Sequence, residues 1–382
     1  MRERIQIDGQ PLSEEKFTRY FFEVWDKLQG ETRPVYFRFL TLLAYHAYIS
    51  EGVDATIIEC GIGGAYDSTN ILEHPTVTGI TSLGIDHVGV LGATLPEIAW
   101  HKAGIMKPGS RCYTPRSQAK EAKSVLEQVA DEKSVELIYV DTDPDIASGK
   151  VPLGLQADFQ KTNASLAVSI ARDFLTRQGY NSSPTLDDGI RQGLSTVKWP
   201  GRCETRHEPG VTWCIDGGHT LESISLAGKW FASYLQRRHE TLSSAHCSRF
   251  LIFNQQTRDA DSLAKALHDT LASSLGDEKP FTHAIFCTNT TFTDTGFRPD
   301  LVSVNTNADD VEALKVQKQL AKTWKGIDAS THVEVVRTIE EAVQIVREEA
   351  DNSNGEGEIT ALVTGSLHLV GGFLEVLETT RR

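Results

Sequence analysis

The sequence predicts an α/β protein made of two successive units, each built on a mostly parallel sheet. Short apolar segments of strand length alternate with amphipathic segments of helix length, which is the pattern of a parallel sheet covered by helices. The alternation breaks near Trp199-Pro200-Gly201-Arg202 and then restarts. We therefore expect a first domain over residues 1–198, a linker over 199–205 and a smaller second domain over 206–382.

Two helices open the first domain, over residues 12–28 and 34–50, and Ser13 is the expected N-cap of the first one. The apolar segment Ala55–Cys60 follows and ends in glycines, as a buried parallel strand does. The later elements of this domain are expected to be strands over 77–83 and 137–140 and helices over 94–103 and 160–178.

In the second domain the same alternation continues to the end of the chain. Strands are expected over 211–215, 249–253, 284–287 and 361–364, and helices from 221 and over 260–274, 309–324 and 338–349. Residues 350–358 are polar, acidic and contain glycine, so a loop is expected there.

Composition excludes several classes of function. The net charge is −14, which argues against a nucleic-acid surface because phosphate neutralisation needs clustered Lys and Arg; a local basic pocket for a small anion remains compatible with it. The six cysteines show no regular spacing, so we expect neither a disulfide scaffold nor a zinc site, and we expect a reducing compartment. No apolar stretch reaches membrane-spanning length, and the first residues lack an apolar signal core.

Three polar residues of the first domain form a candidate site. Glu59 and His87 each follow a predicted strand, and ligands of parallel sheets bind beyond the carboxyl ends of the strands. With Lys102 these residues could surround one cation, although Mg²⁺ prefers oxygen ligands and a lone histidine ligand is unusual. The spacing of these three residues alone is explained more readily if they are ordinary polar residues at strand ends.

Three other segments also allow two interpretations. Gly61-Ile62-Gly63-Gly64 does not match the GxxxxGK[ST] phosphate loop, so it is a tight turn or a ligand-facing segment. Asp216-Gly217-Gly218-His219, between a strand and a helix, favours either a nucleotide-binding edge or an N-cap with a turn. Arg202 would clamp a phosphate or carboxylate, or would lie on the surface as an ordinary arginine.

Read together, these segments resemble a known family. Residues 59–70 are similar to the E-x-G-I-G-G-x-x-D-x-T-N signature of folylpolyglutamate synthases. Five further blocks, at 81–87, 91–105, 199–202, 216–220 and 364–372, follow in the family's order. Residues 253–259 are closest to the fungal branch of the family.

The resemblance implies a fold and a reaction. The fold is that of Mur-type ligases, with a central ATPase domain, here truncated at its N-terminus, followed by a Rossmann-like C-terminal domain. ATP phosphorylates the terminal carboxylate of a folate, and the amino group of L-glutamate attacks the acyl phosphate, in a reaction that depends on positioning and charge neutralisation. Mg²⁺ and ATP are implied, with K⁺ as a further cation; a monomer in the cytosol or mitochondria is expected.

The resemblance also implies roles for individual residues. Glu59 and His87 match residues at the magnesium sites, and Lys102 matches a lysine that is carbamylated in several members of the family. A carbamate would turn this cation into an oxygen ligand for magnesium. Gln160 and Asn163 match a block near the nucleotide.

In the second domain the resemblance assigns three residues. Arg202 and Asp216 match residues that contact ATP, and His219 matches an active-site residue of the C-terminal domain. We expect the first two to bind the nucleotide and His219, with Lys102, to take part in catalysis.

The sequence departs from the family before Glu59. The family's G-T-x-G-K-G-S phosphate loop and its S-P-H segment belong there, and none of the residues before Glu59 matches either one. One explanation is a shortened gene model of an ordinary synthase. The other is a genuine paralogue without the loop, which would ligate another carboxylic acid or bind ligands without catalysis. The intact blocks favour the first explanation.

Overall fold

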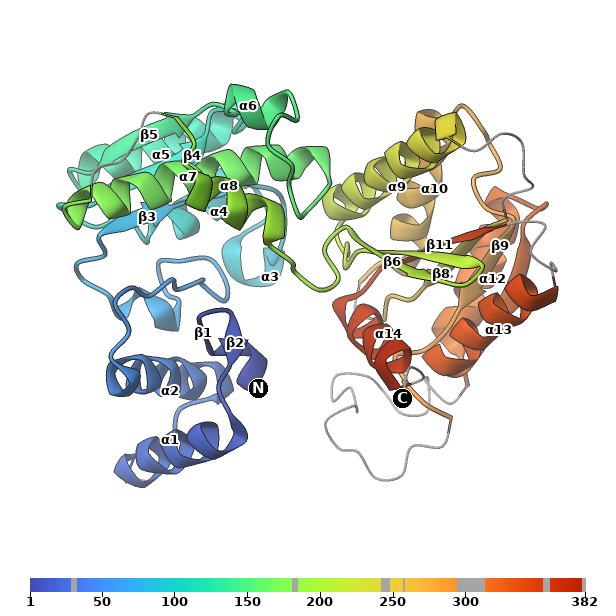
Figure 1. The fold of residues 1–382 in the computed structure, drawn as a ribbon, viewed down its shortest axis with the longest axis horizontal. Helices are drawn as coiled ribbons and strands as arrows, with labels where there is room; N and C mark the ends of the chain where they lie inside the picture. Colours follow the sequence, from blue (N-terminus) through green and yellow to red (C-terminus); the bar gives the residue numbers. More distant parts are fainter. Residues whose placement is uncertain are drawn as a thin grey trace. The chain divides into compact units, whose positions relative to one another are not determined.

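The structure is a computed structural model, which describes residues 1–28, 33–180, 185–241, 248–256, 258–293, 313–352 and 358–379. Contacts divide the chain into two compact units (Figure 1). The first comprises Met1–Thr142 with Ser165–Pro184, and the second Asp143–Ala164 with Thr185–Arg382. Helix α7 (Asp158–Arg177) therefore has residues in both units. The linker over 199–205 stays a prediction.

The first unit begins with a small hairpin and two helices that share one apolar cluster. Ser13 caps the first helix as predicted, because its hydroxyl accepts a hydrogen bond from the Lys16 N–H. Tyr20, Leu40 and Leu43 lie in the buried cluster between the elements. The elements are η1 (Arg2–Arg4), β1 (Gln6–Ile7), β2 (Gln10–Pro11), α1 (Glu14–Lys27) and α2 (Tyr36–Glu51).

A three-stranded parallel sheet, in the order β3-β4-β5, follows in the same unit. Its buried cluster joins Cys112 of the central strand to Ala99 and Leu126 of the neighbouring helices. The central strand was not predicted, because it is short and begins with a charged residue. The elements are η2 (Ser68–Ile71), β3 (Val77–Gly79), α3 (Val88–Leu91), α4 (Leu95–Ala103), β4 (Arg111–Pro115), α5 (Lys120–Glu132) and β5 (Glu136–Val140).

The predicted strand over Ala55–Cys60 is wrong. This segment belongs to no sheet of the described chain, and the side chain of Ile57 is 96% exposed. Strand propensity alone does not form a strand, because the backbone N–H and C=O groups need a paired neighbour. Strand β3 also ends at Gly79, well before His87. The argument that placed Glu59 and His87 at the ends of two strands therefore fails.

The second unit contains a six-stranded sheet in the order β10-β9-β8-β11-β7-β6. All neighbouring strands are parallel except the edge strand β6, which is antiparallel to β7. The apolar runs predicted over 211–215 and 249–253 are strands with those bounds. The strands are β6 (Glu204–Glu208), β7 (Val211–Ile215), β8 (Arg249–Phe253), β9 (His283–Phe286), β10 (His332–Val335) and β11 (Ile359–Thr364).

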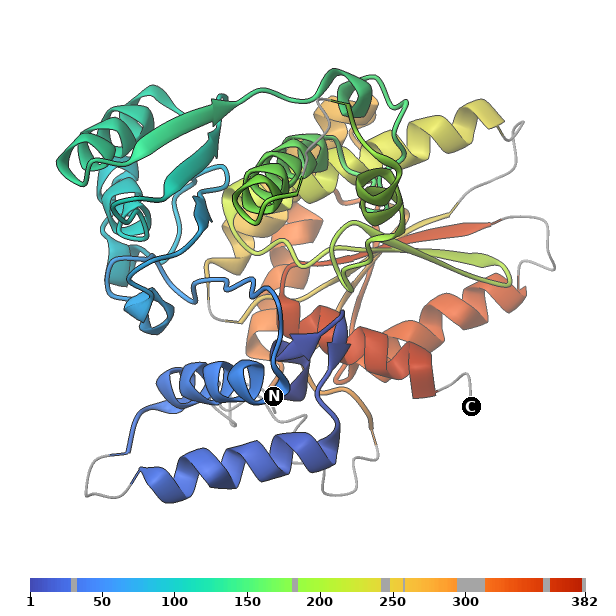
Figure 2. The ribbon, with the colours of Figure 1, turned by 60° about the vertical axis from the view of Figure 1, so that its left-hand side comes forward.

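Helices cover both faces of this sheet (Figure 2). Phe250 and Ile252 pack in the cluster formed with α13 (Ile339–Asn352) and α14 (Leu367–Thr379). Leu251 and Phe253 face the opposite way, toward the other three helices, because side chains alternate along a strand. Those helices are α9 (Leu221–Thr241), α10 (Ala260–Leu275) and α12 (Lys315–Ile327). Helices α6 (Pro144–Ala147) and α8 (Asp188–Thr196) also belong to the second unit.

Two predicted segments need correction or lie partly outside the described residues. Helix α13 continues to Asn352, so the first three residues of the loop predicted over 350–358 are helical, and 353–357 lie outside the described residues. The helix predicted from residue 309 begins at Lys315, and 309–312 also lie outside. No helix within the described ranges combines the length and the apolar character needed to cross a membrane.

Candidate active site

The glycine-rich segment Gly61–Gly64 packs directly on the end of helix α4. A Cβ atom at Gly64 would lie 2.8 Å from the His101 carbonyl oxygen and 2.9 Å from that of Lys102. The Ala65 N–H also donates to the His101 carbonyl at 2.7 Å. Only a glycine permits this backbone approach. The loop that carries Glu59 is thereby held next to the helical turn that carries Lys102.

Asp67 organises this loop, although sequence reasoning gave it no role. Its Oδ2 accepts hydrogen bonds from the N–H groups of Gly61 (3.0 Å) and Ile62 (2.9 Å). Its Oδ1 accepts from the N–H and the hydroxyl of Thr69. Asn70 donates to the carbonyl of Ala65 in the loop and to that of Gly104, the residue directly after α4. A D-x-T-N sequence is typical of turns that side-chain hydrogen bonds close. The sequence therefore contained a pattern that could have indicated the role of Asp67.

Glu59 and Lys102 lie on the two segments that pack together at Gly64. Burial raises the pKa of Cys60, the Lys102 ammonium lowers it and the Glu59 carboxylate raises it further. Glu59 is exposed and Lys102 half-buried. Of the three residues predicted to share a cation, the structure brings these two to one neighbourhood.

His87 is placed differently. It precedes helix α3 in the left-handed region, with φ of 52°, which is uncommon for a residue other than glycine. Its N–H donates to the Asp86 carboxylate at 2.7 Å. No interaction within the described ranges joins His87 to Glu59 or Lys102.

Glu59 presents an exposed carboxylate, which is an oxygen donor of the type that Mg²⁺ prefers. Among the described residues no three His, Cys, Asp or Glu side chains gather into a cage. Mg²⁺ keeps several waters and is usually held by one or two carboxylates together with substrate phosphates. The exposed carboxylate of Glu59 offers such a ligand.

In the second unit, Asp216 is a buried carboxylate at the end of strand β7, with 6% of its surface exposed. It accepts hydrogen bonds from the Cys203 N–H (2.9 Å), the Cys203 thiol (3.3 Å) and the Gly218 N–H (2.9 Å). Burial raises the pKa of Asp216, and these hydrogen bonds and the charge of Arg202 oppose that effect. The structure therefore brings Asp216 and Arg202 together.

The two glycines after Asp216 allow this approach. A Cβ atom at Gly217 would lie 2.3 Å from Leu367 Cδ2 and 2.9 Å from Arg202 Nη1. No hydrogen bond or ion pair joins the Arg202 guanidinium to another described side chain. It lies over the turn as a cation that is available to an anionic ligand.

His219 is held in one tautomer. Its Nδ1 lies 2.9 Å from the Gly217 carbonyl oxygen, which can only accept a hydrogen bond, so Nδ1 carries the proton. The neutral ring then has an unprotonated Nε2. The N–H of His219 donates to the Ser223 hydroxyl at 3.0 Å, which fixes the residue at the start of α9. The turn thus carries a base and lies next to the Arg202 guanidinium.

Gln160 and Asn163 lie one turn apart on helix α7 and contact each other. The Asn163 Nδ2 donates to the Gln160 Oε1 at 3.0 Å. Both residues belong to the second unit and are half-buried. The two residues that were predicted to bind the nucleotide therefore form one cluster of amide side chains.

Comparison with curated proteins decides the family. The chain is 44% identical over 392 residues to the folylpolyglutamate synthase of Neurospora crassa, covering 99% of this chain and 73% of that protein. The chain belongs to the folylpolyglutamate synthase family. A probable folylpolyglutamate synthase of Schizosaccharomyces pombe is 43% identical over 385 residues, covering 98% of this chain and 74% of that protein. The similarity to the fungal members of the family that the sequence predicted is confirmed.

Solved folylpolyglutamate synthase structures confirm the fold. The enzyme of Mycobacterium tuberculosis, solved with ADP and AMPPCP, gives a TM-score of 0.72 at 23% identity and covers 98% of this chain and 81% of that one. Escherichia coli FolC, in complex with DHPP and ADP, gives 0.70 at 22% identity over 100% of this chain and 80% of that one. No protein-family model matches the chain.

Proposed function

We propose that this chain adds L-glutamate to the γ-carboxylate of tetrahydrofolate and of its polyglutamates, with ATP as the energy source. The observation that carries the proposal is the 44% identity to a folylpolyglutamate synthase over 99% of the chain. The two sites described above supply residue types that suit the reaction, because phosphoryl transfer depends on charge neutralisation and positioning.

The loop at Glu59 and the end of helix α4 would hold the metal and the transferred phosphate. Glu59 and His87 are the proposed magnesium ligands, and Mg²⁺ would supply neutralisation of phosphate charge. Lys102 would face the same anions as an ammonium, or serve as an oxygen ligand if it is carbamylated. The packing of Gly64 on α4 supports a shared role for Glu59 and Lys102.

The turn at Asp216 and the amide pair on α7 would bind ATP. Arg202 is the proposed partner of a phosphate, and Asp216 of a nucleotide hydroxyl. Gln160 and Asn163 would add neutral hydrogen bonds to the nucleotide. A carboxylate oxygen of the folate then attacks the γ-phosphorus, ADP leaves, and an acyl phosphate remains.

His219 is the proposed base for the second half of the reaction. The α-ammonium of L-glutamate loses a proton to Nε2 of His219, which is the acceptor atom of the neutral ring because Nδ1 donates to the Gly217 carbonyl. The neutral amine attacks the acyl carbon, and the tetrahedral intermediate expels phosphate as the amide forms. We further propose that the protein is a monomer of the cytosol or mitochondria.

Product analysis tests the function directly. The purified chain is incubated with tetrahydrofolate, L-glutamate, ATP and Mg²⁺, and mass spectrometry should show a folate that has gained one glutamyl residue for each phosphate released. Turnover with another carboxylic acid and none with folates would replace the proposed acceptor. Phosphate release with no glutamyl residue added to any acceptor would contradict the proposed ligase function.

A further inference from the structure

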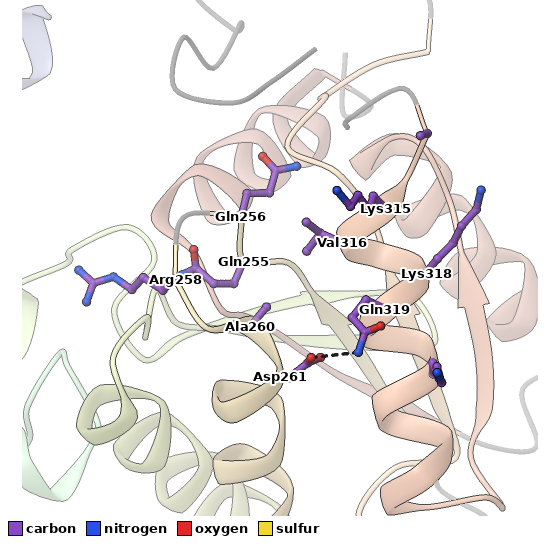
Figure 3. A pocket seen from close by; sticks show the side chains of 11 residues that line it. Gln255, Gln256, Arg258, Ala260, Asp261, Lys315, Val316, Lys318 and Gln319 are labelled. Carbon is purple, nitrogen blue, oxygen red and sulfur yellow. Dashed lines mark hydrogen bonds between the residues drawn. The ribbon is translucent and has the colours of Figure 1, made fainter. Parts of the chain in front are cut away.

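A pocket of about 730 Å³ lies in the second unit, outside the residues assigned above (Figure 3). Its walls are the first turns of helices α10 and α12 and the residues that follow strand β8. All of these elements belong to one unit. The positive ends of two helix dipoles therefore border a single space.

The lining of the pocket is basic although the chain as a whole carries a net charge of −14. Arg258, Lys315, Lys318 and Lys322 line it. Figure 3 shows Arg258 on one side of the pocket and Lys315 and Lys318 on the other. Such a concentration of positive charge favours an anionic ligand.

The acidic groups that the structure describes near the pocket accept hydrogen bonds from neighbouring donors. Asp261, the one carboxylate among the described lining residues, accepts hydrogen bonds from Gln319 Nε2 (3.1 Å) and the Thr323 hydroxyl (2.7 Å). Asp259 caps α10 and accepts from the N–H (3.0 Å) and the hydroxyl (2.6 Å) of Ser262. Within the described ranges neither carboxylate forms an ion pair with Lys318 or Lys322.

A relay of buried amides fixes one wall of the pocket. Gln317 donates to Asn254 (2.9 Å), Asn254 donates to Asn289 (2.8 Å), and Asn289 donates to the Gln256 Oε1 (3.2 Å). Asn254 is fully buried and Gln317 is 1% exposed. The relay uses the oxygen of Gln256 and leaves its amide nitrogen on the side of Lys315 (Figure 3). A satisfied buried polar network specifies one geometry, so the pocket wall is preorganised.

The pocket is connected to the turn that carries Asp216 and His219. The buried Gln255 donates to the Gly365 carbonyl at 2.9 Å, and the Gly365 N–H donates to the Gly218 carbonyl at 3.1 Å. Strands β7, β8 and β11 are parallel neighbours, so these segments all lie at the carboxyl edge of one sheet. Ligands of such sheets bind along that edge.

The spacing of the lysines indicates the class of anion. Lys315, Lys318 and Lys322 lie on one helical face, three and four residues apart, which corresponds to axial steps of about 4.5 and 6 Å. An extended α-linked residue spans about 3.5 Å, and a γ-linked glutamyl residue, with two more backbone bonds, spans roughly 6 Å. Each γ-glutamyl residue carries one free α-carboxylate, so carboxylates and lysines repeat with comparable spacing.

We propose that this basic pocket binds the γ-glutamyl chain of polyglutamylated substrates. The proposal rests on the function proposed above, and it assigns a subsite that monoglutamyl folates would not reach. The lysines are exposed, so each contact is weak and screened by salt. Several contacts along the chain would still give a preference for longer substrates.

Steady-state kinetics test the subsite with two substrates. The double variant Lys318→Gln/Lys322→Gln is expected to raise KM for a pentaglutamyl folate about five- to tenfold, since two exposed ion pairs are lost. KM for the monoglutamyl folate and kcat should change less than about twofold. Lys325→Gln is the matched control, because Lys325 is an exposed lysine of the same helix outside the pocket. An equal KM increase for both substrates would overturn the proposal.

A binding measurement tests the subsite independently of the catalytic activity. Calorimetry with penta-γ-glutamate, which lacks the pteridine, should show binding to the unmodified chain and to Lys325→Gln, and loss of it in the double variant. If the chain turned over no folate but still bound this peptide through the two lysines, the proposed function would fail and the subsite would stand. Equal binding by all variants would refute the subsite alone. Stronger lysine-dependent binding of inorganic triphosphate would identify a phosphate site instead.

Discussion

At the scale of single residues, the chemistry depends on side chains whose hydrogen bonds leave one atom free. His219 donates from Nδ1 to a carbonyl and keeps a basic Nε2. Glu59 has an exposed carboxylate, while Asp67 uses both carboxylate oxygens to hold the neighbouring turn. The resemblance assigned roles to Glu59 and His219, and these roles stay predictions. It assigned none to Asp67, because the role of that residue depends on backbone N–H groups that become neighbours only in the folded loop.

The substitution His219→Asn tests the roles of the two ring nitrogens of the histidine separately. The asparagine Nδ2 can replace Nδ1 as donor to the Gly217 carbonyl, so the unfolding free energy should change by only about 0.5 kcal/mol. The base is lost, and kcat for glutamate-dependent phosphate release should fall about 10²-fold or more. Thermal unfolding and steady-state kinetics check the two parts. A variant with undiminished kcat would remove His219 from the mechanism.

Asp67→Ala tests the turn that carries the glycines. Two backbone N–H groups and Thr69 lose their acceptor, and we expect a loss of about 2 kcal/mol in the free energy of unfolding. Urea denaturation measures this change. Asp54→Ala, at an exposed loop residue, is the control and should leave the unfolding free energy nearly unchanged.

At the scale of elements, the decisive contact is that of the glycine loop with helix α4. The helix itself was predictable, because Thr94 and Glu97 form a capping box at its start. The loop was predicted to follow a buried strand, and this was wrong, since Ala55–Cys60 pairs with no other described segment. Pairing partners depend on distant segments, which local patterns do not specify.

The substitution Gly64→Ala should separate the loop from the helix. The new Cβ would meet two backbone carbonyl oxygens at 2.8 and 2.9 Å, and overpacking of this kind costs about 1–3 kcal/mol. Gly193→Ala in helix α8 is the opposite case, with no atom within 4 Å of the added Cβ, and should stabilise by about 0.5–1 kcal/mol. Chemical denaturation of both variants checks the contrast. Equal effects would show that the contact at Gly64 is not restrictive.

At the scale of the whole molecule, sequence patterns predicted two α/β units and most of the second sheet. The apolar runs of β7, β8 and β11 are buried on both faces, which makes them conspicuous. The edge strand β6 contains only polar and charged residues and was missed. The basic pocket was also beyond prediction, because its residues come from two segments that are far apart in the sequence.

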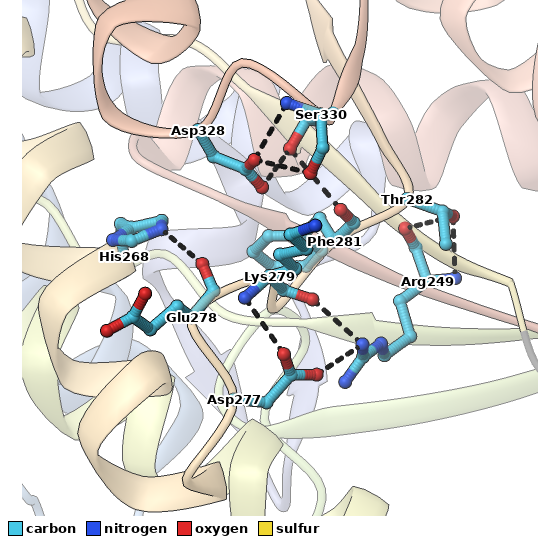
Figure 4. A network of polar contacts seen from close by, with 10 residues as sticks. Arg249, His268, Asp277, Glu278, Lys279, Phe281, Thr282, Asp328 and Ser330 are labelled. Atoms are coloured by element: carbon cyan, nitrogen blue, oxygen red, sulfur yellow. Dashed lines mark hydrogen bonds and ion pairs between the residues drawn. The ribbon is translucent and has the colours of Figure 1, made fainter.

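Acid stability of the second unit depends on carboxylates near the start of its strands (Figure 4). Burial raises the pKa of Asp277, but the hydrogen bonds from Arg249 (2.7 Å) and from the Lys279 N–H (2.9 Å) outweigh it and lower the pKa below 3.8. A carboxyl group whose pKa is lower in the folded state contributes its full stabilisation at pH values above its pKa in the unfolded state. This stabilisation is lost as the pH falls through its pKa in the folded state.

The unfolding free energy should therefore fall as the pH drops below about 4, and Asp277→Asn should flatten this dependence. Denaturant titrations at several pH values measure both slopes. Asp26→Asn, at an exposed position of α1, is the control and should retain the slope of the unmodified chain. A slope unchanged by Asp277→Asn would contradict the role of the Arg249 contact.

The central claim is that the loop carrying Glu59 and the helix end carrying Lys102 act on the same metal-bound phosphate. A double-mutant cycle with Glu59→Gln and Lys102→Gln, read out as the Mg²⁺ dependence of phosphate release, tests it most directly. Glu59→Gln alone should raise the half-saturating Mg²⁺ concentration about tenfold or more, and Glu73→Gln, at an exposed residue of the first unit, should not. The account predicts that the effects of the two variants are strongly non-additive. Independent, additive effects would contradict it.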